Sequence, residues 1–419
     1  MSEDSAPPDR CNLLFLIMMI HGVGTLMPWN MFITAKEYFT DVKLNVSQIE
    51  DRNSTEFRTL DEYNKGFMGY VIIASQMPNL LCNLMSLFIQ FDSKSIGPRI
   101  AGSIMIEIVL FVITVAVAML DSSGWPNTFF FITIASLVIM GAAGGIYQNS
   151  IYGLSAKLPG KYTGAIVLGT NISGTLASAM NILATFASPS QKTAAIYYFI
   201  SALFVLLLCL DTYFALPLIK IYRHYQKQAT LDESSAGGRP PYWTVFKQCW
   251  FNCLNVFLCF FGTLACFPAI AADITAIDAD FPVPPVYFVK IFCFLFFNMF
   301  AMIGNVFPMW CKFPRSPRFL IVPVLLRLLF IPFFLACNYR PGERLYGVMF
   351  DDYAYIGGMV VFALSHGYYS SLTMMYAPHG IHSRYSGLAG MMAAFFLVLG
   401  IVIGGNSLFL VNQFMLQPQ

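Results

Sequence analysis

The chain has 419 residues, of which 57% are hydrophobic and only 11% are charged, and its 24 Lys and Arg nearly balance its 22 Asp and Glu. About a quarter of the residues of a water-soluble protein of this length would be charged. The composition therefore excludes a soluble domain and predicts an integral membrane protein, and the aromatic share of 16% suits rings that settle at membrane boundaries.

The N-terminal segment, MSEDSAPPDR, is acidic and contains proline. A cleavable signal peptide would carry a basic region before a short apolar core. We therefore expect residues 1–11 to remain as a cytosolic N-terminus and the first apolar segment to remain as a membrane span.

Long apolar stretches, broken by charges or by Pro, Gly and Asn clusters, predict eleven transmembrane helices. Their expected ranges are 12–35, 66–91, 99–120, 128–156, 162–187, 194–219, 244–272, 284–310, 318–338, 351–377 and 385–412. The stretches lack the alternation of a membrane β-barrel, and a helix satisfies its own backbone in lipid. The predicted fold is an all-α polytopic membrane protein.

The polar stretch 220–243 divides these helices into a six-helix bundle, 12–219, and a five-helix bundle, 244–412. Its sequence KQATLDESSAGGRPP is rich in Gly and Pro, and we expect a flexible cytosolic linker. Two bundles joined by such a linker are typical of a two-lobed transporter, in which the lobes rock about a solute site at their interface.

The charge distribution predicts the orientation. Fourteen Lys and Arg fall on the side of the N-terminus and nine on the other side, where acidic residues gather in the loop 36–65. We therefore expect a cytosolic N-terminus, an extracellular C-terminus at 413–419 and a place in the plasma membrane. The acceptor sequons at Asn45 and Asn53 lie in the same loop and predict glycosylation there.

Polar residues inside the predicted spans are candidates for a cavity or gate. Gln76, Asn79 and Asn83 recur at helical spacing and share one face of the second helix. Amides also join helices by hydrogen bonds, so each is either structural or a ligand contact. Their number favours a neutral solute with many hydrogen-bonding groups over a simple ion.

Three ionisable residues lie in the spans: Glu107, Asp211 and Arg327. A structural ion pair and a gating or proton-linked role remain alternatives for them. For Arg327 we expect a partner acid, or carbonyls freed by Pro323 and Pro332 on the same helix.

Several sequence blocks resemble the equilibrative nucleoside transporters. They are GTLMPWNMFITAKEYF in the first helix, GGIYQNSIYGLSAKLPGKYTGAIVLG across the fourth and fifth, LLRLLFIPFFLACNYRP in the ninth, ALSHGYYSSL in the tenth and AGMMAAFFLVLG in the last. The resemblance implies an eleven-helix relative of the major facilitator fold that equilibrates nucleosides, and often nucleobases, by facilitated diffusion. It implies that Leu26, Trp29 and Asn30 line the cavity, that Gln148 hydrogen-bonds the base and that Asn298 lies nearby.

The resemblance breaks in the eighth helix, NMFAMIGN. Asn298 and Gly304 match the family pattern, but Ala301 replaces its Asp and Asn305 replaces its Arg. That pair is understood to hold the ribose hydroxyls, and neutral side chains do not reproduce its charge-assisted bonds. The change leaves open a nucleobase preference, weak nucleoside affinity, or another small solute such as an organic cation, which would need an acid such as Glu107 or Asp211.

The sequence contains no Walker A motif, zinc-type spacing or GxSxG elbow, and we expect neither an enzyme nor a bound metal or cofactor. The expected partners are a small solute and the bilayer, without nucleic acid or an obligate protein partner. A membrane receptor that does not transport is the remaining alternative.

Overall fold

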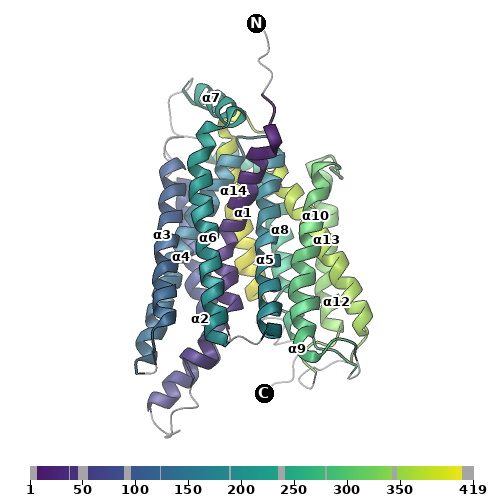
Figure 1. Cartoon of the computed structure of the whole chain (residues 1–419). Coiled ribbons are helices and arrows are strands. Elements are labelled where there is room, and N and C mark those ends of the chain that lie inside the picture. The colour runs from purple at the N-terminus through teal and green to yellow at the C-terminus, as the bar shows by residue number, and fades with distance from the viewer. Residues whose placement is uncertain are drawn as a thin grey trace.

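A computed structural model describes residues 7–36, 38–45, 55–88, 96–122, 124–187, 190–234, 241–278, 281–341 and 347–407. The described residues form a bundle of long helices (Figure 1). The first half contains α1 (Leu13–Thr34), η2 (Tyr38–Lys43), α2 (Thr55–Phe88), α3 (Ile96–Met119), α4 (Pro126–Ser155), α5 (Gly160–Ala187), α6 (Gln191–Ala215) and α7 (Lys220–Ser234). The second half contains α8 (Tyr242–Cys266), α9 (Pro285–Phe288), η7 (Val289–Leu295), α10 (Phe296–Val306), α11 (Ile321–Leu326), η10 (Arg327–Leu329), α12 (Phe330–Ala336), α13 (Asp352–Tyr376) and α14 (Ser383–Asn406).

Within the described residues, ten helical segments are long and apolar enough to cross a membrane. The eleventh expected crossing is α13, which is equally long but buries His366, Ser370, Ser371 and Thr373. These buried polar groups lower its hydropathy without shortening it. The predicted all-α membrane fold with eleven long helical segments is confirmed.

The eighth and ninth crossings are not continuous α-helices. The eighth passes from α9 through the π-helical η7 into α10, and the ninth passes from α11 through the 3-10 turn η10 into α12. Pro323 and Pro332 lack the N–H that an uninterrupted ninth helix needs. The break places Arg327 at the start of η10.

Each half of the chain packs as its own lobe. In the N-terminal lobe α1 packs on α5 and α6, and α4 packs on α2 and α3. In the C-terminal lobe α8 packs on α13 and α14, and α10 packs on α13. This arrangement is the expected six-plus-five, two-lobed bundle.

Two sequence-based boundaries differ from the structure. The second helix begins at Thr55, well before residue 66, because the segment from Thr55 carries Leu60 and Phe67, which are buried in the core. Residues 220–234 of the expected flexible linker form α7, which buries Ile221, Tyr222 and Ala229 against the bundle. Helix-forming residues with one apolar face favour this helix over a flexible chain.

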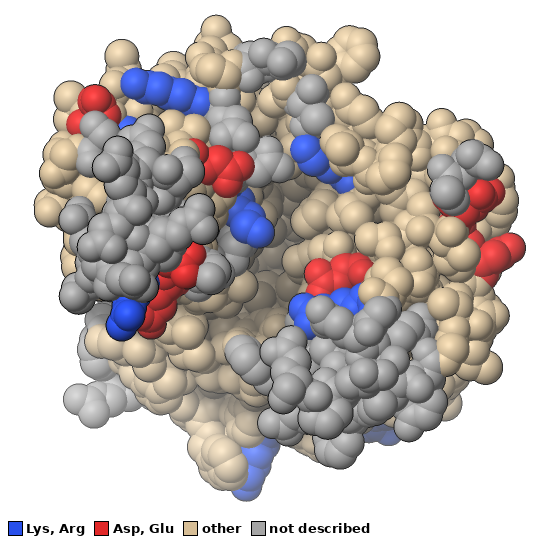
Figure 2. Space-filling view, turned by 90° about the horizontal axis from the view of Figure 1, so that it is seen from below, with Lys and Arg blue, Asp and Glu red and all other residues tan. Residues whose placement is uncertain are grey.

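The lobes meet mainly at the end of the bundle where α1 begins, which we call the upper end, as in Figure 1. There α14 contacts α2 and α4, while α10 and α13 contact α5; α5 also touches η7 further down. Seen from the opposite, lower end, the molecule is hollowed near its centre (Figure 2). The arrangement is therefore closed at the upper end and open at the lower end.

Candidate functional site

Close helix contacts fix the N-terminal side of the lobe boundary. The Cα of Gly169 in α5 lies against the backbone of Met19 and Val23 in α1, and that of Gly145 in α4 lies against the backbone of Asn79 in α2. A methyl group at either glycine would collide with backbone atoms. These contacts set the positions of the polar residues on α1, α2 and α4.

On α1 the three expected cavity residues follow one another around a single turn. Leu26, Trp29 and Asn30 are all partly exposed, and Trp29 packs on the edge of the N-terminal core. Asn30 Nδ2 donates to Ser173 Oγ of α5 at 2.9 Å. Asn30 therefore ties α1 to α5 and still has its amide oxygen for a further partner.

Gln148 on α4 has the features expected of a solute contact. Its side chain is 5% exposed, and the described residues offer its amide no hydrogen bond. The next residue, Asn149, donates both to Asn83 Oδ1 of α2 at 2.7 Å and to the Met391 carbonyl of α14 at 3.1 Å. This turn of α4 thus lies at the lobe boundary, and Gln148 brings an unpaired donor and acceptor there.

Asn298 also lies at the boundary, on α10. Its Nδ2 donates to the Phe294 carbonyl of its own crossing at 2.9 Å. Its Oδ1 lies against Gly174 of α5, where any side chain would collide with it. The Asn298 amide, which faces the N-terminal lobe, therefore already has one hydrogen bond, through its nitrogen.

Both residues of the substituted pair on α10 are fully buried. Ala301 packs its carbonyl against Gly367 of α13. Asn305 Nδ2 donates across the boundary to the Val167 carbonyl of α5 at 3.3 Å, and its Oδ1 accepts from Ser371 Oγ at 3.0 Å. Asn305 thus joins the lobes by neutral hydrogen bonds, a role that its replacement of Arg did not reveal.

The polar face of α2 packs against α4. Asn83 is bonded to Asn149, while Asn79 Oδ1 is buried without a partner in the described part of the chain. Gln76 is partly exposed. Of the two alternatives for this face, the structure shows a protein-packed side for Asn79 and Asn83.

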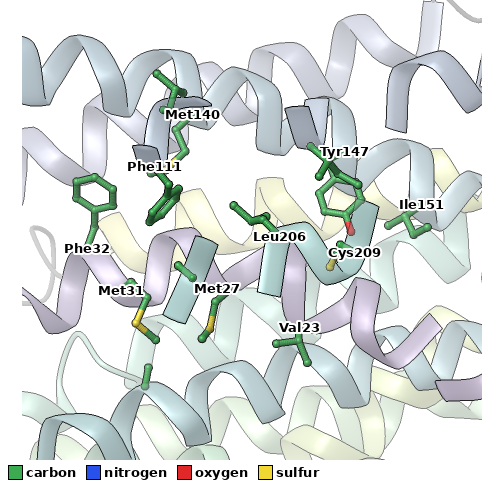
Figure 3. Packing of buried hydrophobic residues seen from close by; sticks show 14 of the residues in the cluster. Val23, Met27, Met31, Phe32, Phe111, Met140, Tyr147, Ile151, Leu206 and Cys209 are labelled. Carbon is green, nitrogen blue, oxygen red and sulfur yellow. The ribbon is translucent and has the colours of Figure 1, made fainter. Parts of the chain in front are cut away.

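The two acids in the spans have opposite environments. Glu107 of α3 is 1% exposed, and its Oε2 has no partner among the residues described. Asp211 of α6 is exposed on the outside of the lobe. Beside Glu107, Tyr147 of α4 and Cys209 of α6 point toward each other, and the Tyr147 hydroxyl lies 2.7 Å from His21 Nδ1 (Figure 3).

Arg327 is 3% exposed and is held by neutral groups of the C-terminal lobe. It donates to Ser365 Oγ at 3.1 Å, to Thr263 Oγ1 at 2.9 Å and to the Cys259 carbonyl at 3.2 Å. The expectation of carbonyls freed by Pro323 and Pro332 is wrong, since the carbonyl comes from α8. The described residues give Arg327 no acid, and its guanidinium lies 5.2 Å from the ring centre of Phe362.

Lys43 anchors the lower end of the N-terminal lobe. Its Nζ donates to the Leu120 carbonyl at the end of α3 at 2.6 Å and lies 5.1 Å from the Phe129 ring centre. Burial, with a smaller contribution from Lys192, lowers the pKa of the Lys43 ammonium. Of the two predicted glycosylation sites, Asn45 follows this anchor and is partly buried, whereas Asn53 lies outside the described residues.

Gln148 and Asn298 remain predicted site residues, and the sequence did not reveal the hydrogen-bond partners of the polar groups near them. Ser370 and Ser371 of α13 donate to Asn305 within the C-terminal lobe, and Asn149 donates across the boundary to α14; only the polarity of these residues within apolar helices marks them in the sequence. Within the described ranges no group of three His, Cys, Asp or Glu side chains could hold a metal ion. The side-chain hydrogen bonds described across the boundary come from the neutral amides of Asn149 and Asn305.

Comparison with known proteins identifies the family. The sequence profile described as Nucleoside transporter matches residues 133–239 and 231–412. Equilibrative nucleoside transporter 2 of Homo sapiens is 30% identical over 98% of this chain and 99% of its own length. Equilibrative nucleoside transporter 1 of Rattus norvegicus is 29% identical over the same shares, and equilibrative nucleotide transporter 1 of Arabidopsis thaliana is 24% identical over 96% and 87%.

The structure of a double-tryptophan mutant of XylE is similar with a TM-score of 0.60 and 14% identity, covering 96% of this chain and 89% of XylE. At that identity the likeness concerns the fold alone, and it supports the two-lobed, major-facilitator-like arrangement. The profile match and the near-complete overlap with 30% identical relatives lead to one conclusion: this chain is a membrane transporter that belongs to the nucleoside transporter family.

Proposed function

We propose that this chain carries nucleosides and nucleobases down their gradients across the plasma membrane by alternating access. The observation that carries the proposal is Gln148, a buried amide at the lobe boundary without a partner in the described structure. An amide both donates to and accepts from a base edge, and Trp29 offers an apolar ring beside it.

The proposed orientation makes the upper end cytosolic and the lower end extracellular, with the lysines and arginines in excess at the upper end. The arrangement then has its cytosolic gate closed, because α14 contacts α4 and α10 contacts α5 at that end. Its hollow faces outward (Figure 2). We expect rocking of the two lobes to break the Asn149 and Asn305 contacts and to open the cytosolic side.

The charges favour neutral cargo over an organic cation. Arg327 is buried in the C-terminal lobe, and no acid of the described chain offsets it. Asp211 is exposed on the outside of α6, and Glu107 lies inside the N-terminal lobe, so neither supplies the boundary with the acid that a cation needs. Uncompensated positive charge of this kind repels a cation and leaves a neutral solute unaffected.

The absence of charge at Ala301 and Asn305 lowers the expected affinity for ribose. Charge-assisted hydrogen bonds are about twice as strong as neutral ones, and Asn305 is already engaged with Val167 and Ser371. We therefore expect free bases to be carried at least as well as their nucleosides.

The test is radiolabelled uptake in cells without their own nucleoside transport, comparing adenine, adenosine, uridine and an organic cation. Gln148→Leu removes the amide, and we expect uptake of the bases to fall by about tenfold, because a good neutral hydrogen bond and the cost of an unpaired partner contribute about 1–2 kcal/mol. Gln228→Leu makes the same change on the exposed face of α7 and serves as the control.

Unchanged uptake of every base and nucleoside by the Gln148→Leu variant would refute the assigned contact. Uptake into sealed vesicles that saturates with solute separates a carrier from a receptor, because a receptor binds solute without accumulating it in the lumen.

A further inference from the structure

Glu107 is a buried acid that the proposed solute site does not use. It lies on α3 in the middle of the N-terminal lobe and is 1% exposed. Its Oε1 would lie 3.3 Å from a methyl group at Gly144 of α4, and Asn79 Nδ2 of α2 would lie 3.6 Å from the same point. Glu107 is thus enclosed between α2 and α4, the two helices that carry the boundary amides.

Within the described part of the chain, no Lys or Arg side chain pairs with Glu107. The titratable groups turned toward it are the Tyr147 hydroxyl of α4 and the Cys209 thiol of α6, and His21 of α1 lies behind Tyr147. From α2 it faces the amide of Asn79. The described residues record no ion pair for Glu107, and its Oε2, Asn79 Oδ1 and His21 Nε2 are all buried without partners.

A carboxylate enclosed in this way is unstable unless it carries a proton. An unpaired charge within a membrane protein costs at least a few kcal/mol, whereas a protonated carboxyl carries no charge and has a hydrogen to donate. Asp211 in the neighbouring helix α6 is not destabilised in this way, because its side chain is exposed. The two acids therefore form a natural pair of test and control.

We propose that Glu107 is a proton-binding site whose occupancy sets the rate of transport. The inference rests on the proposed transport function. The proton comes from solvent and returns to it, and no other group changes its covalent state.

The site acts through α2 and α4. Gly144 and Gly145 hold α4 against Glu107 and the Asn79 backbone, and the next turn of α4 carries Gln148 and Asn149. Loss of the proton leaves a carboxylate that requires water or a new partner, and α2 and α4 would have to separate to admit either. The proton thus stabilises the packed arrangement in which Asn149 reaches α14.

The first experiment measures uptake of a nucleobase into proteoliposomes that have the same pH on both sides, from mildly acidic to mildly alkaline pH. We expect the wild-type rate to fall with rising pH by up to about tenfold per pH unit, as one titrating carboxyl dictates. Glu107→Gln, which mimics the protonated acid, should transport at a rate that no longer depends on pH, and Asp211→Asn should follow the wild type. The same pH profile for Glu107→Gln and the wild type would overturn the proposal.

A second measurement does not depend on transport. Infrared spectra of the purified protein at neutral pH should show the C=O stretch of a protonated carboxyl that Glu107→Gln lacks and Asp211→Asn retains. If the wild type shows no such band relative to Glu107→Gln, Glu107 is ionised and the proton site is refuted, even if transport proceeds. If no nucleobase enters the vesicles but the band is present, the proposed cargo fails and the proton site stands.

Discussion

The lobe-crossing hydrogen bond of Asn305 leads to a quantitative prediction about the gate. Asn305→Ala removes the bond from Nδ2 to the Val167 carbonyl, which among the described residues is the only side-chain hydrogen bond of Asn305 that leaves the C-terminal lobe. A neutral hydrogen bond contributes about 1 kcal/mol. The loss should therefore shift the equilibrium by about fivefold toward the arrangement with the upper end open.

The assay uses Met375, which packs against Gly160 and Gly164 of α5 across the closed upper end. A Met375→Cys variant is treated with a membrane-impermeant thiol reagent from the upper side, and labelling is measured relative to the parent with its native cysteines. Adding Asn305→Ala should raise the labelling rate by about fivefold, because Met375 becomes accessible only when the lobes separate there.

The matched control is Asn255→Ala on α8. Asn255 is as fully buried as Asn305, but its Nδ2 bonds only to the Phe251 carbonyl of its own helix. If Asn305→Ala and Asn255→Ala change the labelling rate equally, Asn305 does not hold the lobes together and the reasoning is wrong.

Three further predictions concern the charges of the C-terminal lobe. The double variant Ala301→Asp with Asn305→Arg should raise the ratio of uridine to adenine uptake above that of the wild type. Either change alone should reduce uptake of both solutes, because it buries an unpaired charge. An unchanged ratio in the double variant would contradict this prediction. Arg327→Met should leave the melting temperature in detergent within a few degrees of the wild type. The groups that accept from Arg327 each keep another hydrogen bond, because Thr263 Oγ1 donates to the Cys259 carbonyl at 2.8 Å and Ser365 Oγ donates to the Phe362 carbonyl at 2.8 Å. The same variant should admit more organic cation, and uptake of a labelled cation no greater than wild type would count against electrostatic exclusion by Arg327.

The sequence predicted the helices well because a membrane span depends on about twenty apolar residues and little else. The expected α2 was too short because Thr55 to Tyr63 contains charges, which hydropathy reads as loop even though Leu60 is buried. The 3-10 turn at Arg327 lies within a segment that we expected to be one continuous helix. The prolines on either side of it predict where the helix is interrupted, but they do not predict that the interruption is a 3-10 turn. Local composition thus predicts which segments cross the membrane, whereas the helix geometry of each crossing depends on packing between helices.

The site was harder to predict, because its residues act in pairs from distant helices. Asn149 and Met391 are 242 positions apart, and Asn305 and Val167 are 138 apart, so no local pattern links them. The loss of the Asp and Arg at 301 and 305 was visible in the sequence, but the new partner of Asn305 was not. Likewise, Glu107 is buried and Asp211 is exposed because of how α3 and α6 are rotated about their axes within the bundle. The sequences of the two helices are similarly apolar and do not reveal that rotation.

The amide hydrogen bonds described between the lobes carry no charge, and this matters for the mechanism. The two side-chain bonds described across the upper end, Asn149 to Met391 and Asn305 to Val167, both run from an amide to a backbone carbonyl. At about 1 kcal/mol each they bias the bundle by a factor that solute binding can overcome. A buried ion pair in the same place would cost several kcal/mol to separate, and a carrier driven by the solute gradient alone has no other source for that energy. The neutral amides at the boundary are therefore what a facilitative transporter requires of its gate.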